Sequence, residues 1–247
     1  MSRIAREWVR TEAGFRQKVV FIRFETGQRV EHMVTLVSTG VCAVTGLAQK
    51  FHEAEISRLV ITGLGGIEFV RNIHHVFAIL LGVGALYHVV GVVYGIARRG
   101  SRLSMVPTLR DVSDFLTMIR YFFGLSKEKP RFDRFTYEEK VEYWALVWGT
   151  LLMGLTGFIM WFPTRATEFM DGVWIVAAKM AHGWEAVLAV LSLLVWHLYQ
   201  VHIKRFNTSM FTGKMTREHM LEEHPVEYAR LVAEEGEAEL APFTPVK

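Results

Sequence analysis

Four stretches of this 247-residue chain are long and apolar enough to cross a lipid bilayer as helices. A hydrocarbon core about 30 Å thick requires roughly 20 helical residues. The stretches cover residues 30–47, 73–97, 141–162 and 173–203. One such stretch could be a buried helix of a soluble protein, but four in a chain of this length indicate a membrane protein. We therefore predict an all-α fold, a four-helix transmembrane bundle.

Basic residues are distributed unevenly between the two ends of these spans. Residues 1–29, 98–140 and 204–247 hold 7, 10 and 6 Lys and Arg, whereas the other two connections hold only Lys50, Arg58, Arg71, Arg165 and Lys179. The positive-inside rule then predicts that both termini face the cytoplasm. We divide the chain into a cytoplasmic N-terminal segment (1–29), a membrane domain (30–203) and a cytoplasmic C-terminal tail (204–247). The basic N-terminus lacks the apolar core of a signal peptide, and the tail is expected to be a surface helix with an acidic end.

Histidine is the candidate ligand for a redox centre in this sequence. The single cysteine, Cys42, cannot form an internal disulfide or a cysteine-ligated cluster, and no C-x-x-C-H motif is present for covalent haem. Ionisable residues inside membrane helices are costly and usually functional. Seven of the ten histidines lie in or at the ends of the predicted spans: His32, His74, His75, His88, His182, His197 and His202.

The spacing of these histidines favours two b-type haems between the helices. At about 100° and 1.5 Å per residue, His74 and His88 would lie within roughly 40° of one face and about 21 Å apart along the axis. His182 and His197 have a similar relation. Two haems at two depths would each take axial imidazoles from facing helices. A zinc site would instead group three or four ligands at one level, and a single membrane histidine could serve only as a hydrogen-bonding group.

Several sequence motifs resemble a known family. They are RFETGQRVEHMVTLVSTGVCAVTGL around the first span, RNIHHVFAILLG in the second and EKVEYWALVWGTLLMGLTGFIMWFP in the third. AHGWEAVLAVLSLLVWHLYQVH and GKMTREHMLEEHPVEY follow in the fourth span and the tail. Over about residues 21–230, the chain resembles the membrane cytochrome b subunits of quinone-linked respiratory enzymes, above all the gamma subunit of respiratory formate dehydrogenase.

The resemblance implies a ligand set. It implies that His74 and His182 hold one haem near the periplasmic face, and that His32 and His197 hold another near the cytoplasmic face. A menaquinone site would adjoin the second haem. One alternative concerns the first haem. His75 could replace its neighbour His74 as a ligand.

The remaining alternatives concern histidines and polar residues that the family does not fix. His88 has no counterpart in the gamma subunit, and it could pair with His197 or join His202 in a third haem. Arg71 could bind a haem propionate through charge-assisted hydrogen bonds, or simply anchor its helix at the interface. Where the gamma subunit has a quinone-binding asparagine, this chain has Thr136, followed by Tyr137, and either hydroxyl could contact a quinone carbonyl or merely mark a helix start.

The function predicted from these observations is electron transfer, with no site for oxidising a substrate in this chain itself. It would be a membrane-anchoring di-haem subunit of a quinone-linked oxidoreductase in the cytoplasmic (inner) membrane of a bacterium or archaeon. The expected partners are an iron–sulfur or multihaem cytochrome subunit, a catalytic subunit, and menaquinone or ubiquinone; no nucleic acid is expected. The alternatives are a three-haem or hydrogenase-type cytochrome b, and a membrane protein for metal or haem transport or assembly.

Overall fold

The computed structural model describes residues 3–11, 14–99, 103–204 and 206–235. The first half of the chain contains β1 (Ile4–Thr11), β2 (Gly14–Ile22), α1 (Thr26–Lys50), α2 (Glu55–Gly63), α3 (Ile67–Arg99) and α4 (Leu109–Phe122). The second half contains α5 (Tyr137–Trp161), α6 (Pro163–Ala166), α7 (Val173–Ser192), η1 (Leu193–His197), η2 (Tyr199–Lys204), α8 (Ser209–Thr212), β3 (Lys214–Thr216), α9 (Arg217–Glu223) and α10 (Pro225–Glu235). These elements form two compact units, one of residues 30–101 and 144–206 and the other of residues 1–29, 102–143 and 207–247. The predicted boundaries of the membrane domain, at residues 29/30 and 203/204, stay a prediction.

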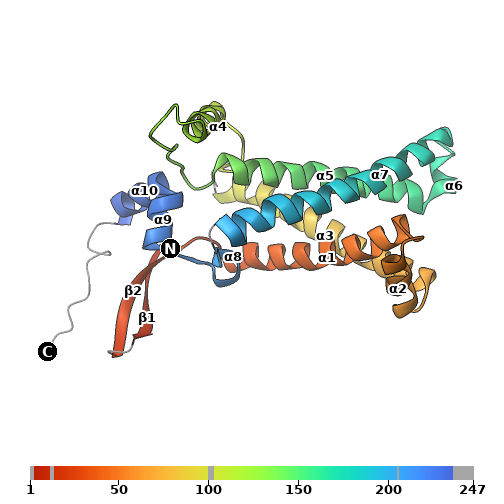
Figure 1. Ribbon diagram of the computed structural model, residues 1–247, viewed down its shortest axis with the longest axis horizontal. Helices are drawn as coiled ribbons and strands as arrows, with labels where there is room; N and C mark the ends of the chain where they lie inside the picture. Colours follow the sequence, from red (N-terminus) through yellow and green to blue (C-terminus); the bar gives the residue numbers. More distant parts are fainter. Residues whose placement is uncertain (1–2, 12–13, 100–102, 205, 236–247) are drawn as a thin grey trace. The chain divides into compact units, whose positions relative to one another are not determined.

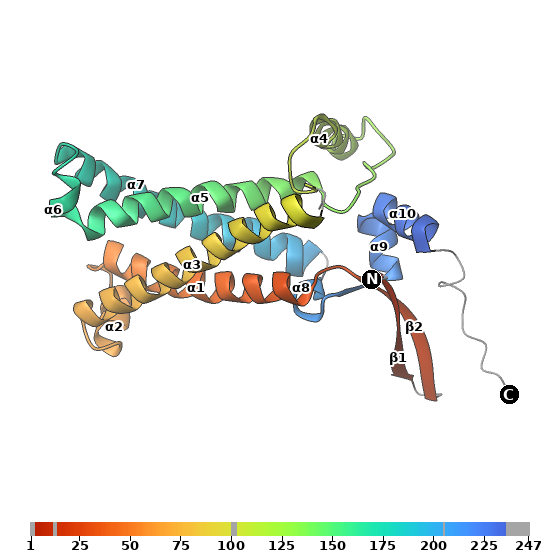
Figure 2. The ribbon, with the colours of Figure 1, turned by 180° about the vertical axis from the view of Figure 1, so that it is seen from behind.

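The first unit is a helical bundle. In Figures 1 and 2, α1, α3, α5 and α7 run alongside one another, with α2 and α6 in the connections at one end. All four long helices are apolar and long enough to span a membrane, and at most 11% of each apolar window is buried within the protein. Apolar side chains that face outward in this way require a nonpolar solvent. The predicted all-α transmembrane bundle is therefore confirmed.

The fourth long helix changes its hydrogen bonding part of the way along. After Ser192 it continues as two π-helical segments, η1 and η2, and the Leu198 amide donates to the Leu193 carbonyl five residues earlier. π-helical turns are rare, and they occur frequently at functional sites. His197 is the last residue of η1. Its direction consequently does not follow from counting α-helical turns from His182.

The second unit contains a small antiparallel sheet that the sequence analysis did not predict. Strand β1 pairs with β2, and β2 pairs with β3 from the C-terminal tail through the contacts Val20–Thr216 to Ile22–Lys214. Phe21, Met215, Met220 and Leu231 are buried together there. The tail thus contains a strand and three short helices that contribute buried side chains, and not the single surface helix expected. The predicted acidic end, residues 236–247, lies outside the described residues.

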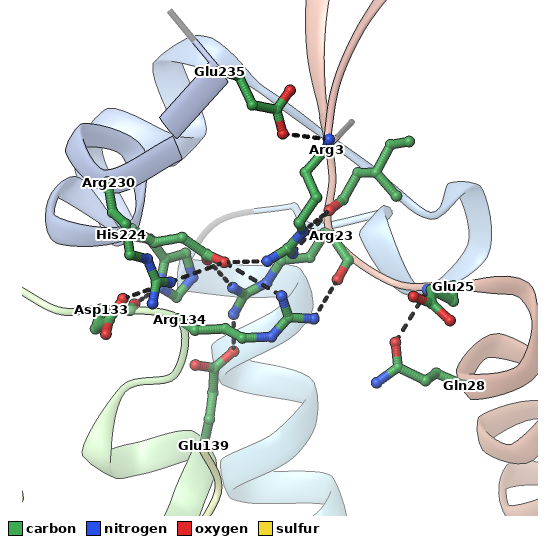
Figure 3. A network of polar contacts seen from close by, with 12 residues as sticks. Arg3, Arg23, Glu25, Gln28, Asp133, Arg134, Glu139, His224, Arg230 and Glu235 are labelled. Atoms are coloured by element: carbon green, nitrogen blue, oxygen red, sulfur yellow. Dashed lines mark hydrogen bonds and ion pairs between the residues drawn. The ribbon is translucent and has the colours of Figure 1, made fainter. Parts of the chain in front are cut away.

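A carboxylate surrounded by arginines joins the segments of this second unit. Glu227 of α10 is fully buried and accepts hydrogen bonds from Arg3 at 2.9 Å, Arg23 at 2.7 Å and Arg134 at 3.3 Å. Figure 3 shows these arginines converging from separate segments, together with Arg230 and Glu139. Since each arginine comes from a different part of the sequence, the cluster ties β1, β2, the segment before α5 and α10 together.

The segment before α5 is held by two further contacts. The Thr136 hydroxyl accepts a hydrogen bond from the Glu139 amide, and the Thr136 amide donates to the Glu139 carboxylate, which is a reciprocal capping box. Lys140 forms an ion pair with Asp111 of α4 at 2.7 Å. Burial raises the pKa of Asp111, but hydrogen bonds from Lys140 and Thr108 together lower it by more. The pKa of Asp111 is therefore below its ordinary value. The start of α5 is therefore fixed by polar contacts within its own unit.

Candidate haem-binding site

Two pairs of histidine rings face each other inside the bundle. His74 of α3 lies opposite His182 of α7, with ring centroids 6.3 Å apart and ring planes at 67°. His32 of α1 lies opposite His197 of η1, also with centroids 6.3 Å apart, and with ring planes at 30°. Each pair joins two different helices. The structure therefore brings together the four histidines in the two pairs that the resemblance implies.

The separation within each pair suits a metal ion between two imidazoles. Metal–imidazole bonds are about 2 Å long in zinc sites, and two such bonds plus the distance from each nitrogen to its ring centre give a separation of roughly this size. Among the described residues, no group of three or more His, Cys, Asp or Glu side chains could hold a metal ion. Paired axial ligands without further protein ligands are what a b-type haem requires, since its porphyrin supplies the other four. The residues present thus fit this cofactor.

Two threonines, which the sequence analysis missed, contact the first histidine pair. Thr45 Oγ1 lies 2.9 Å from His74 Nδ1, and Thr156 Oγ1 lies 2.9 Å from His182 Nδ1. A Cβ atom at the following residue, Gly46 or Gly157, would lie only 3.1 or 3.2 Å from the imidazole Cε1. The absence of a side chain there lets each ring approach the neighbouring helix. The signal in the sequence was a Thr–Gly pair in both the first and the third span.

The other candidate histidines have different neighbours. His75 stacks on Trp161 with centroids 3.9 Å apart and ring planes at 20°. His88 Nδ1 lies 2.7 Å from a carboxylate oxygen of Glu31, and His202 lies against Phe206 with centroids 5.6 Å apart. The pairing of His88 with His202 in a third haem stays a prediction.

Arg71 lies at the end of the bundle where α2 connects to α3. Its guanidinium donates to both carboxylate oxygens of Glu68 at 3.0 Å, on an exposed surface. It also lines a cavity of about 660 Å³ whose other basic side chains are Arg58, Lys179 and His52. The positive charges of Arg58, Arg71 and Lys179 would attract the propionates of a haem held by His74 and His182. This propionate contact stays a prediction for Arg71.

The two residues predicted to contact a quinone are engaged within the protein. The Thr136 hydroxyl caps α5, as described above, and only 5% of this residue is exposed. The Tyr137 ring contacts Phe115 and Phe132, with centroids 5.6 Å and 5.9 Å away. The capping contact accounts for Thr136 without a quinone, whereas Tyr137 retains its role as a candidate.

Part of the chain is similar to a known protein family. Residues 101–213 match the family model described as prokaryotic cytochrome b561. The matched segment, somewhat less than half of the chain, contains His182 and His197, one ligand candidate from each pair, and Thr156. No curated protein matches the chain. The family match, the four spans and the facing histidines together support a membrane cytochrome b that takes part in electron transfer.

Proposed function

We propose that this chain is the di-haem membrane subunit of a quinone-linked respiratory oxidoreductase. The observation that carries the proposal is the presence of two facing histidine pairs in one apolar bundle, His74–His182 and His32–His197. A b-type haem in each pair would supply one-electron transfer. Two centres on different helix pairs would give a relay through the bundle, because His32 lies near the start of α1 while His74 faces its end, at Thr45.

The chain's own residues would hold, orient and insulate these centres. Four imidazoles supply the axial ligands, and the apolar surface of the helices keeps them in the membrane. Gly46 and Gly157 allow His74 and His182 to lie close to neighbouring helices. A protein sets the reduction potential of a haem through its hydrophobic surroundings and the geometry of its axial ligands.

The resemblance to the gamma subunit of formate dehydrogenase is the reason for proposing quinone exchange and partner subunits. Menaquinone or ubiquinone would exchange electrons at the His32–His197 end. An iron–sulfur or multihaem cytochrome subunit would exchange them at the other end, and a catalytic subunit would act on the substrate. The cations around the cavity near Arg71 would favour an acidic partner surface or haem propionates.

The orientation in the membrane gives a first prediction. Because 23 of the 28 Lys and Arg residues lie in the terminal segments and the connection between the second and third spans, both termini should face the cytoplasm. A reporter fused after Lys247 should be active on the cytoplasmic side, and one inserted within residues 163–172 on the opposite side. Activity of both reporters on the same side would contradict the four-span orientation.

Replacing Tyr137 with phenylalanine tests the quinone contact. We expect Tyr137→Phe to slow reoxidation of the reduced haems by a menaquinone analogue severalfold, while the visible spectrum stays unchanged. Thr136 is the poorer choice for substitution, since losing its cap would cost about 1 kcal/mol of stability by itself. Tyr121→Phe is the matched control on α4. An unchanged reoxidation rate in Tyr137→Phe would place the quinone contact elsewhere.

A visible spectrum separates this proposal from a role in metal or haem transport or assembly. The purified cytochrome should show a sharp alpha band that appears on reduction with dithionite and that is present in proportion to the protein. A transport or assembly protein would bind haem or metal in variable, substoichiometric amounts. Spectra of that second kind would overturn the proposed electron-transfer role.

A further inference from the structure

Thr45 and Thr156 make the same set of contacts in two different helix pairs. The Thr45 hydroxyl lies 2.7 Å from the Val41 carbonyl and 2.9 Å from His74 Nδ1. The Thr156 hydroxyl lies 2.6 Å from the Leu152 carbonyl and 2.9 Å from His182 Nδ1. Both threonines are buried, with 2% and 7% of the residue exposed. One arrangement thus occurs twice, between α1 and α3 and between α5 and α7.

A hydroxyl carries only one hydrogen, and this fixes the direction of the contact with histidine. Each backbone carbonyl is an acceptor, so the threonine must donate its hydrogen there. The hydroxyl oxygen then has only lone pairs left, and it accepts a hydrogen bond from the imidazole Nδ1–H. Both imidazoles are therefore held as the tautomer that is protonated on Nδ1. Their Nε2 atoms keep a lone pair with which to bind a metal.

We propose that Thr45 and Thr156 are positioning residues that fix the tautomer and ring orientation of the two ligands of one haem, and thereby lower its reduction potential. This inference rests on the proposed haem binding. A hydrogen bond from the remote N–H of a metal-bound histidine makes the imidazole a stronger donor. Stronger donation stabilises the ferric form over the ferrous form, so the threonines would make this haem harder to reduce. Gly46 and Gly157 keep the space beside each ring clear.

Replacing each threonine with valine and with serine tests the hydroxyl separately from the packing. Valine matches threonine in shape but cannot accept the hydrogen bond, whereas serine keeps the hydroxyl. The measurements are a redox titration of both haems and the electron paramagnetic resonance spectrum of the oxidised protein. Spectral positions of ferric bis-imidazole haem depend on the angle between the imidazole planes, which a released ring would change. Gly40→Ala on α1 and Gly154→Ala on α5 are matched controls, because an added Cβ meets nothing within 4 Å at either site.

We expect Thr45→Val and Thr156→Val to raise the potential of the same haem. The removal of an outer-shell partner typically changes metal binding about 10- to 100-fold; a tenfold change in the ferric-to-ferrous balance corresponds to about 59 mV for one electron. The double variant should shift this haem further, and the other haem should keep its potential. The serine variants and the two glycine controls should resemble the unaltered protein.

Three results would overturn the inference. One is unchanged potentials and spectra in both valine variants while two haems remain bound. Another is a shift of different haems by the two variants, because the threonines would then not serve a common pair. The third is equal loss of one haem in the valine and serine variants, which would assign the effect to packing. Selective loss of that haem in the valine variants alone would support the inference. An unaltered protein without haem would instead overturn the proposed function itself.

Discussion

Replacing His182 with alanine is expected to remove one haem and to halve the haem-to-protein ratio. The ring centroids of His182 and His74 lie 6.3 Å apart, and each ring would supply one axial ligand to the same haem. With one imidazole gone, the cofactor would have a single axial ligand and would be retained poorly, while the His32–His197 pair would be untouched. The measurement is a haemochrome assay of purified protein, with the content of the unaltered protein as the reference.

Combined substitutions distinguish the pairing from other arrangements. His74→Ala should remove the same haem as His182→Ala, so the double variant should lose no more than either single variant. His32→Ala should remove the other haem. His75→Ala and His202→Ala are controls, since these rings contact Trp161 and Phe206. If His74→Ala and His182→Ala together removed both haems, the pairing would be wrong.

Replacing Glu227 with glutamine is expected to lower the free energy of unfolding by about 3–5 kcal/mol, the usual effect of removing one partner from a buried ion pair. The side chains of Glu227 and Arg23 are 0% and 1% exposed, and Arg3 and Arg134 contact the same carboxylate. Without the negative charge, the arginines would be left close together and poorly solvated. Burial and the neighbouring Arg3 already lower the pKa of Arg134 to about 10.

The effect of Glu227→Gln should be local to the second unit. In the full chain in detergent, hydrogen exchange should become faster in β2 and α10, because Arg23 follows β2 and Glu227 lies on α10. The haem content should remain that of the unaltered protein. Glu234→Gln, an exposed position on the same helix, is the matched control and should change nothing. Equal exchange rates in both variants would mean that the cluster contributes little to stability.

The four spans were predictable because membrane crossing imposes a length and an apolar composition on each helix separately. The predicted span of residues 73–97, for example, lies within α3, which extends from Ile67 to Arg99. Such a signal is local, and it does not depend on which helix lies next to which. The ligand pairs His74–His182 and His32–His197 followed from the resemblance, because helix neighbours cannot be deduced from the spacing within one helix.

Helical spacing alone could not identify the partner of His88. It placed His74 and His88 on one face of the second span, each opposite a histidine of the fourth span. In the structure, His88 contacts Glu31 of α1, and α1 contributes His32 to the second pair. The change to π-helical hydrogen bonding after Ser192 also alters the direction of His197. Spacing at 100° per residue holds only for an uninterrupted α-helix, and η1 and η2 interrupt this one.

The sheet and the arginine cluster depend on contacts between distant parts of the chain. β3 has three residues and pairs with β2 almost 200 positions earlier, so its local sequence carries little strand signal. Glu227 appeared to be one more charge on a polar tail, and its burial depends on arginines from three other segments. The roles of Thr45 and Thr156 could not be predicted either, because the hydroxyl of a threonine in a membrane helix normally hydrogen-bonds only to the backbone of its own helix.

The number and coordination of the haems test the central claim most directly. A haemochrome assay of the purified, unaltered chain, combined with electron paramagnetic resonance of the oxidised protein, measures both quantities on one sample. The two facing histidine pairs predict two b-type haems per chain, each low-spin with two imidazole ligands. Their spectra should differ, because the ring planes meet at 67° in one pair and at 30° in the other. One haem per chain, or a high-spin haem with one ligand, would contradict the account.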